Sequence, residues 1–343
     1  DADPSNAKFP SPEERALLAL FREADQSQLQ FNAIIEREVL RVSNDVVWPI
    51  IRAAWPGVDG DPAAKKLEAC IAPYTNLALS CVVCSRKRPR SFRVLSRIAR
   101  VVDLDEKKIA AMAARVVPLM FRVFEKRRME RAALGAALII VFDEALDDGM
   151  HDVALASRPR HLCDVLEGKR APTSERLAAV AAVGSAMRER IFDVDDAEAL
   201  HRVVELFGVW ADSERQNLEG EEDPHGLCHR KPAMIASMEV LAWGIAPYAG
   251  DKEIAWMCNC AHFAQMVDDL LDLEKDERQG RRTPAREGLW SVETTARAFR
   301  EAEAELVAIA KEGGEEDGPY LRLVVETFRA QCRVSAEILA ANP

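Results

Sequence analysis

The sequence predicts an all-α protein folded as a single large helical bundle. Of its 343 residues, 48% are apolar, and Ala, Leu, Val, Glu and Arg dominate while Tyr and Gly are scarce, a balance that favours helix over sheet. Apolar residues recur with helical spacing, and no alternating strand pattern, repeat or low-complexity tract is present. No long Ser-, Gly- or Pro-rich linker divides the chain, which indicates one domain over residues 1–343.

The first expected helix begins at Ser11, which can cap it, with Pro12 in the first turn and Glu14 three positions on. Glycine and proline mark the clearest later breaks, at 57–60, 220–226, 247–250 and 313–314. The expected helices span residues 11–25, 27–53, 62–83, 89–101, 106–127, 129–148, 151–167, 173–191, 196–218, 230–246, 251–276, 291–312 and 319–340.

The net charge of -11 argues against nucleic acid as the main partner, because phosphate binding draws on a surplus of Lys and Arg. An anionic substrate would need locally concentrated positive charge or metal. The longest apolar stretch, residues 132–142, is too short to span a bilayer, and the amino terminus lacks the layout of a secretion signal. We therefore expect a cytoplasmic protein without a membrane span, unless a presequence was removed.

Eight cysteines lie mostly within apolar helical pattern, which in a cytoplasmic chain predicts reduced, buried thiols. Two groups have spacing typical of metal ligands: the pair Cys81 and Cys84, and the group Cys258, Cys260 and His262. Neither has an obvious matching second pair, so buried thiols are favoured over structural zinc.

The first of two acidic clusters ends the strongly apolar stretch at residues 132–142 and contains Asp143, Glu144 and Asp147. Residues four apart lie on one helical face, so Asp143 and Asp147 project together. The second cluster follows the same logic. It ends another apolar helix, with Asp268, Asp269 and Asp272 in sequence and Asp276 one turn further.

Carboxylates held this close repel one another unless a cation offsets their charge. Hard oxygen ligands suit Mg²⁺, which takes one or two carboxylates and completes its octahedron with water and phosphate oxygens. A single acidic run is best explained as a solvated helix end. Two such runs, each continuous with an apolar face, favour a metal site instead.

The two clusters resemble the Asp-Asp-x-x-Asp motifs of the trans-isoprenyl diphosphate synthase (polyprenyl synthetase) family, which has the class I terpenoid synthase fold. The second motif is intact and follows Gln265, whereas Glu144 replaces an Asp of the first. The resemblance covers roughly residues 85–310 and implies a bundle around a central apolar cavity, with several Mg²⁺ ions bridging the diphosphate of a prenyl substrate. It implies as metal ligands Asp143, Glu144, Asp147, Asp268, Asp269 and Asp272.

Further segments resemble family motifs in the family's order. Residues 228–236 resemble the segment whose lysine contacts the allylic diphosphate, which implies a catalytic role for Lys231 with Asp143 and Asp268, and a possible one for Arg230. Three other segments resemble diphosphate-binding elements. They imply contacts from Lys87, Arg88 and Arg90 (like Gly-Lys-Arg-x-Arg-Pro), from Gln216 (like Gln-x-x-Asp, with Glu219 in place of Asp) and from Arg281 (within 280–282, like Gly-Lys).

Two departures from the family pattern stand out. The Arg-Arg-Gly expected after the first acidic motif is absent, and whether Arg158 and Arg160 replace it stays open. The interval between the basic segment and the first acidic motif is also longer than usual. Each basic residue has a simpler explanation: residues 86–97 as a solvated helix face and Lys231 as a surface lysine, although a helix start does suit an anion.

The resemblance implies Mg²⁺-dependent ionisation of an allylic prenyl diphosphate, followed by head-to-tail addition of isopentenyl diphosphate. Because no aromatic ring stands at Leu138 or Ile139, with Gly135 a turn earlier, it also implies products of about fifteen carbons or more. One alternative is a terpene cyclase of the same fold acting on a longer prenyl diphosphate, since residues 268–276 can be read as a variant of the cyclase motif. Another is a non-catalytic helical partner subunit. A homodimer is suggested by the family alone.

Overall fold

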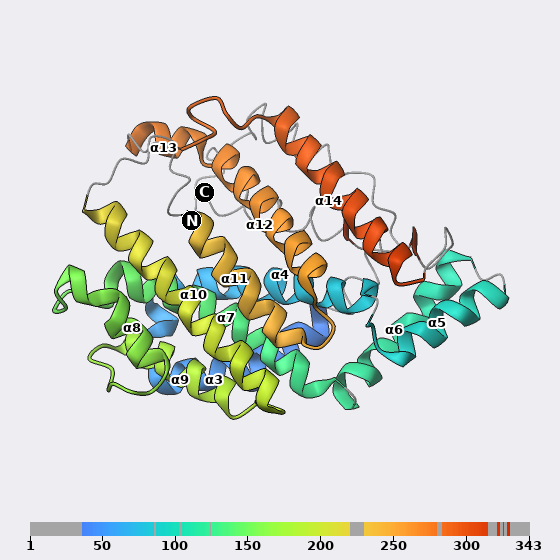
Figure 1. Ribbon diagram of the computed structural model, residues 1–343, viewed down its shortest axis with the longest axis horizontal. Helices are drawn as coiled ribbons and strands as arrows, with labels where there is room; N and C mark the ends of the chain where they lie inside the picture. The colour runs from blue at the N-terminus through green and yellow to red at the C-terminus, as the bar shows by residue number, and fades with distance from the viewer. Residues whose placement is uncertain are drawn as a thin grey trace, which may run out of the picture.

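The computed structural model describes residues 36–85, 87–102, 105–123, 125–219, 230–279, 283–314, 321–322, 325 and 328–329. Within these ranges the chain forms helices and turns and no strand, so the all-α prediction is confirmed for them (Figure 1). Residues 36–42 are helical and lead into the elements η2 (Ser43–Val47), α3 (Trp48–Ala54), η3 (Val58–Gly60), α4 (Pro62–Cys84), α5 (Arg90–Val101), α6 (Glu106–Val123), α7 (Lys126–Asp148), η4 (Leu155–Ser157), α8 (Arg158–Leu166), α9 (Glu175–Arg188), α10 (Val194–Leu218), α11 (Arg230–Ile245), α12 (Asp251–Leu271), α13 (Leu273–Gln279) and α14 (Val292–Glu312).

The predicted helix over 251–276 is wrong in one respect, because the structure divides it at Asp272. The Asp272 amide donates to the carbonyl oxygen of Asp268 at 2.9 Å and closes the last turn of α12. The apolar pattern that packs α12 ends at Leu271, and the mostly charged residues beyond it form the separate short helix α13. The expected helix 11–25 lies outside the described residues, as do the first part of 27–53 and most of 319–340.

Helix α7 is the centre of the bundle. Every residue of the apolar stretch 132–142 is buried, and α7 packs against α4, α9 and α11 (Figure 1). A helix that is apolar on all sides has to be enclosed by other helices, which explains why this stretch lies in the core. In the part of the chain that the structure describes, no helix has the length and apolarity needed to cross a membrane.

Small residues allow α7 and α11 to cross closely. A methyl group added at Gly244 would lie 2.7 Å from the Cα of Ala132, and one at Gly135 would lie 3.1 Å from the carbonyl oxygen of Val240. Such distances leave no room for a side chain at either glycine. Gly135, which the sequence placed near a pocket floor, therefore packs against the backbone of the neighbouring helix.

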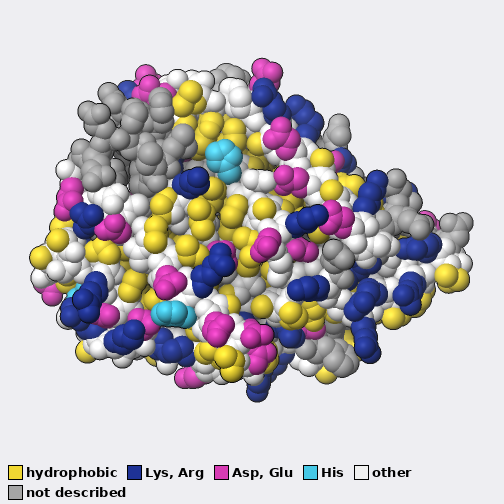
Figure 2. Space-filling model, in the orientation of Figure 1, with side chains coloured by type: hydrophobic (Ala, Val, Ile, Leu, Met, Phe, Trp, Pro, Cys, Tyr) yellow, Lys and Arg dark blue, Asp and Glu magenta, His cyan; other side chains and the backbone are white. Residues whose placement is uncertain are grey.

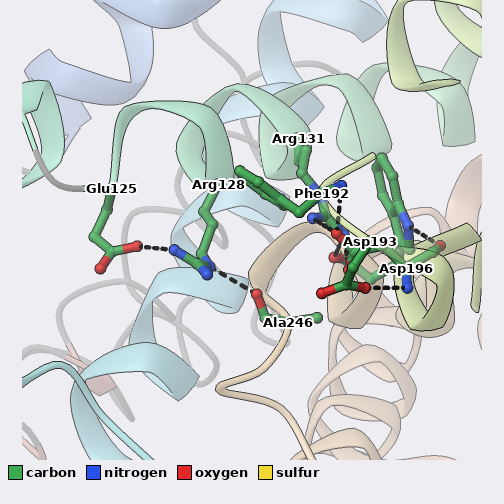
Figure 3. Close-up of polar contacts among 8 residues, drawn as sticks. Glu125, Arg128, Arg131, Phe192, Asp193, Asp196 and Ala246 are labelled. Atoms are coloured by element: carbon green, nitrogen blue, oxygen red, sulfur yellow. Dashed lines mark hydrogen bonds and ion pairs between the residues drawn. The ribbon is translucent and has the colours of Figure 1, made fainter. Parts of the chain in front are cut away.

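The amino-terminal half of α7 is fixed by two arginines (Figure 3). Arg128 donates to a carboxylate oxygen of Glu125 at 2.8 Å and to the carbonyl oxygen of Ala246 at 2.7 Å. Fully buried Arg131 donates through both terminal nitrogens to Asp196, at 2.7 and 3.0 Å. These contacts tie α7 to α10 and to the loop after α11, and so fix where its acidic carboxyl-terminal end emerges.

The long interval before the first acidic motif is occupied by α5 and α6. These helices contact each other, α6 contacts α7, and the pair extends from one end of the bundle, at the right of Figure 1. The ends of α10 and α12 and the start of α11 lie together at the opposite, upper-left side of that view. The bundle therefore has two distinct ends.

Candidate functional site

The first acidic cluster contacts a lysine from α4. The Lys66 ammonium lies 2.5 Å from Oδ2 of Asp143 and 3.2 Å from Oε1 of Glu144. Burial alone would lower the pKa of Lys66, but the two carboxylates outweigh it and raise the pKa, so the lysine stays charged. One protein cation thus pairs with two predicted metal ligands.

The ends of α4 and α7 are joined by an arginine that the sequence did not single out. Arg176 of α9 contacts Oδ2 of Asp61 at 2.9 Å and Oδ2 of Asp148 at 3.1 Å. Asp61 also caps α4 by accepting from the amide of Ala63. This clamp helps to align Lys66 with the first cluster, whose other predicted ligand, Asp147, is exposed at the end of α7.

The second acidic cluster is held to the start of α11. Asp269 is buried, and its two oxygens accept hydrogen bonds from Arg230 Nη1 at 2.6 Å and from Gln265 Nε2 at 3.0 Å. Arg230 is the first residue of α11, so this ion pair brings Lys231, which is exposed, close to the end of α12. In this structure the predicted metal ligand Asp269 therefore holds the end of α12 to the start of α11.

The other acidic residues of the second cluster differ in exposure. Asp268 and Asp272 are half-buried near the end of α12, while Asp276 is buried on α13. Gln265 Nε2 lies 3.5 Å from Oδ2 of Asp268. Asp268 and Asp272 are thus the more accessible carboxylates of this cluster.

The charges of both acidic clusters act on one face of α4. Lys66, Cys70 and Tyr74 are spaced four apart and so lie on the same face of that helix. Burial raises the pKa of Cys70 to about 11, and the negative charges of Asp268 and Asp143 both contribute; burial and the same two charges also raise the pKa of Tyr74. Asp143 on α7 and Asp268 on α12 therefore both lie near this face of α4.

The donor atoms of this region fit Mg²⁺. Within the described ranges, no three His, Cys, Asp or Glu side chains approach closely enough to hold a metal ion by themselves. Mg²⁺ needs only one or two carboxylates when water and phosphate supply the remaining oxygens. The Lys66 ammonium already lies where a cation offsets the charges of Asp143 and Glu144.

The predicted basic segment is not near the acidic clusters. Lys87 and Arg90 are exposed and Arg88 is buried, all just beyond the carboxyl-terminal end of α4. Lys66 lies at the other end of α4, and at 1.5 Å per residue the helix separates it from Lys87 by about 30 Å. The structure thus places Lys66 at the first acidic cluster, whereas residues 87–90, which the resemblance implied as diphosphate contacts, lie beyond the far end of α4.

Neither arginine considered as a replacement for the missing Arg-Arg pair contacts the first cluster through a described interaction. Arg158 donates to the carbonyl oxygen of Val153 at 3.2 Å. Arg160 is 91% exposed and lies 4.0 Å from Asp164 of its own helix. The arginine that does reach this region is Arg176.

The two other residues predicted to contact diphosphate are Gln216 and Arg281. Gln216 lies near the end of α10 and donates to Asp212 of the same helix at 3.0 Å. Arg281 lies outside the described residues.

Leu138 lines a cavity of about 180 Å³ between α7, α8, α9 and α10, with Leu166, Met187 and Leu200 among its other walls. Ile139 is buried.

The described cysteines of the two groups with metal-type spacing are thiols. Cys81 and Cys260 are buried and Cys258 is half-buried, with burial raising the pKa of Cys258. Burial lowers the pKa of His262, whose ring lies edge-on to Trp290 at 5.4 Å. The described cysteines thus contribute to packing, as the sequence analysis favoured.

No protein-family model matches the chain, and no curated protein or solved structure matches it either.

Proposed function

We propose that the chain is a Mg²⁺-dependent enzyme that ionises an allylic prenyl diphosphate. The observation that carries this proposal is that the charges of Asp143 on α7 and Asp268 on α12 both raise the pKa values of Cys70 and Tyr74, which lie on one face of α4. Paired carboxylates on two sides of one space, with Lys66 and Lys231 nearby, suit a diphosphate held together with divalent cations.

Different residues would hold the metal and the substrate. Asp143, Glu144 and Asp147 would supply oxygens from α7, and Asp268 and Asp272 would supply them from α12. Bound Mg²⁺ would act as Lewis acid and template for the departing diphosphate.

The cationic side chains would act on the diphosphate itself. With Asp143 holding metal, Lys66 would donate hydrogen bonds to phosphate oxygens instead. Lys231 lies in the first turn of α11, where the helix dipole favours an anion. The ion pair with Asp269 positions Arg230 beside Lys231.

The apolar surroundings would protect the allylic cation. Buried side chains of α7 precede Asp143 directly, and Phe142 packs edge-on to Phe207 at 4.7 Å between ring centroids. Such walls exclude water, which would otherwise capture the cation.

The cation has two possible fates. Head-to-tail addition of isopentenyl diphosphate is our first proposal, because residues 87–92 and 228–236 resemble the family's diphosphate-binding segments. A terpene cyclase is the second candidate, because cyclisation needs no second diphosphate and residues 87–90 lie about 30 Å away along α4.

Product analysis tests both fates. Purified protein is incubated with Mg²⁺ and geranyl, farnesyl or geranylgeranyl diphosphate, with and without isopentenyl diphosphate. Longer prenyl diphosphates formed only with isopentenyl diphosphate support elongation, whereas hydrocarbon released without it supports cyclisation and excludes elongation.

Two site variants test the proposal itself. We expect Asp143→Asn and Asp268→Asn each to lower turnover at least about a hundredfold, because both remove charge that holds metal. Asp195→Asn, at an exposed position in the first turn of α10, should keep full activity. No turnover with any substrate would favour the non-catalytic partner subunit instead, and equal turnover in all four proteins would place the reaction outside the two acidic clusters.

A further inference from the structure

Helix α5 presents two parallel stripes of exposed side chains that the proposed reaction does not use. Arg93, Arg97 and Arg100 form one stripe and Val94, Ile98 and Val101 the other, each with spacing i, i+4, i+7. The three aliphatic side chains are 53%, 40% and 82% exposed. Phe92 and Ser96, on the side of α5 opposite the aliphatic stripe, are buried, so the aliphatic stripe faces outward from the bundle with the arginine stripe along its flank.

The charge of this region is opposite to that of the whole protein. Helix α5 contains four arginines and no Asp or Glu. Residues 87–123 contain ten Lys and Arg but only three Asp and Glu, in a chain whose net charge is -11. Figure 2 shows Lys and Arg side chains beside apolar ones at the right end of the molecule, where α5 and α6 lie. Approach to an anionic surface would therefore favour this end.

Helix α6 repeats the arrangement. Val116, Leu119 and Val123 lie on one face and are 37%, 60% and 61% exposed. Arg115 on the same helix is exposed, and Arg122, seven residues further on, is also exposed but donates hydrogen bonds to both carboxylate oxygens of Glu38. Both helices of the projecting pair thus combine exposed aliphatic and arginine side chains.

We propose that α5 and α6 dock the protein onto an anionic lipid bilayer. An interfacial helix inserts an aliphatic stripe at the boundary between headgroups and acyl chains, while neighbouring arginines bind phosphate groups of the lipids. The order of stripes on α5 meets both requirements, because the arginine stripe lies directly beside the aliphatic one. This inference does not depend on the proposed reaction.

A second copy of the chain fits this surface less well. In a two-fold contact the same face meets itself, which would bring the arginine stripes of two copies together without acidic partners on α5. A nucleic acid would match the arginines but would leave Val94, Ile98 and Val101 without an apolar environment. An anionic bilayer offers phosphate groups to the arginine stripe and an apolar layer to the aliphatic stripe.

Vesicle co-sedimentation of the full chain tests the proposal. We expect binding to vesicles of phosphatidylcholine mixed with phosphatidylglycerol, weakening at high salt, and little binding to phosphatidylcholine alone. Arg93→Gln with Arg97→Gln should weaken binding about 30-fold, since each basic residue near the surface contributes roughly 1 kcal/mol. Val94→Ser with Ile98→Ser should weaken binding to the same vesicles even at low salt.

The matched control is Arg297→Gln with Arg300→Gln, two exposed arginines on α14 that carry the same charge. This control should bind like the unmodified protein, and circular dichroism should show all variants folded. Equal binding to neutral vesicles, or equal loss in the control, overturns the proposal. Absence of vesicle binding also overturns the proposal. In that case, an oligomer mass that changes with the α5 substitutions would indicate a second copy as the partner, and DNA binding that changes with them would indicate a nucleic acid.

Discussion

Lys66 of α4 and Asp143 of α7 form a 2.5 Å ion pair although 77 residues separate them in the sequence. The same ammonium lies 3.2 Å from Glu144, so one lysine serves both acidic side chains at the start of the first motif. The lysine therefore competes with any metal for these carboxylates, and a substrate that draws Lys66 away would favour metal binding.

Lys66→Gln should change Mg²⁺ affinity and turnover in opposite directions. Removing the ammonium leaves Asp143 and Glu144 uncompensated, so Mg²⁺ should bind more tightly to the substrate-free protein, by several-fold. Turnover should nevertheless fall at least about tenfold, because the diphosphate loses a cationic donor. Calorimetric Mg²⁺ titration and steady-state kinetics measure the two quantities. Lys65→Gln, one residue away and exposed, is the control and should change neither. Weaker Mg²⁺ binding in Lys66→Gln would contradict the proposed competition.

The pKa of the Cys70 thiol tests whether the two acidic clusters lie around the same part of α4. Its pKa is raised to about 11, first by burial and then by Asp268 and Asp143, while Lys66 lowers it. Asp143→Asn and Asp268→Asn should therefore lower this pKa and speed alkylation of Cys70, and Lys66→Gln should slow it. Below the pKa, a decrease of one unit raises the thiolate fraction about tenfold.

The measurement is the rate of iodoacetamide labelling of the peptide containing Cys70, followed by mass spectrometry. Cys163 on α8 is an internal control, because its pKa is also raised to about 11 but by burial, Glu167 and Asp164. Its rate should be the same in all variants. A response of Cys70 to Asp143→Asn but not to Asp268→Asn would show that the clusters are separate, and would remove the main support for the proposed reaction.

The sequence predicted the helices well because their causes are local. Residue spacing, capping residues such as Ser174 and Ser291, and glycine- or proline-containing breaks all act within a few positions. The division of α12 from α13 at Asp272 was missed because an unbroken acidic run still has helical spacing. The change of direction there depends on where packing against other helices stops.

The site was predictable only in part. Asp143 and Asp268 were predicted from acidic runs that end apolar helices, and the charges of both raise the pKa of Cys70 on α4. Lys66 and Arg176 were missed because their partners are distant in sequence, and only the packing of α4, α7 and α9 makes the contacts. A lysine in the first turns of a capped helix gives no local signal of such a partner.

The close crossing of α7 and α11 predicts a sensitive glycine. Gly244→Ala would place a methyl group 2.7 Å from the Cα and 2.9 Å from the backbone nitrogen of Ala132, so the helices must separate. We expect a loss of about 1–3 kcal/mol in the free energy of unfolding, measured by urea denaturation. Gly60→Ala, where no atom lies within 4 Å of the new methyl group, should stay within about 0.5 kcal/mol of the unmodified protein. Equal stability of the two variants would show that the helices do not cross this closely.

The buried pair of Arg131 and Asp196 predicts a larger loss. Arg131 is fully buried and donates to both oxygens of Asp196, so Asp196→Ala leaves a buried guanidinium without its counter-charge (Figure 3). Breaking one side of a buried pair costs about 3–5 kcal/mol, and urea unfolding should show a loss of this size.

The exposed pair of Arg52 and Asp59 provides the comparison, since both side chains are more than half exposed and lie 3.0 Å apart. Asp59→Ala should cost less than about 1 kcal/mol, because water screens exposed charges and solvates the arginine that is left. Arg131→Met combined with Asp196→Ala should recover part of the loss of Asp196→Ala, since no buried charge then remains unpaired. Similar losses from Asp196→Ala and Asp59→Ala would mean that the pair does not hold α7 to α10 as the structure indicates.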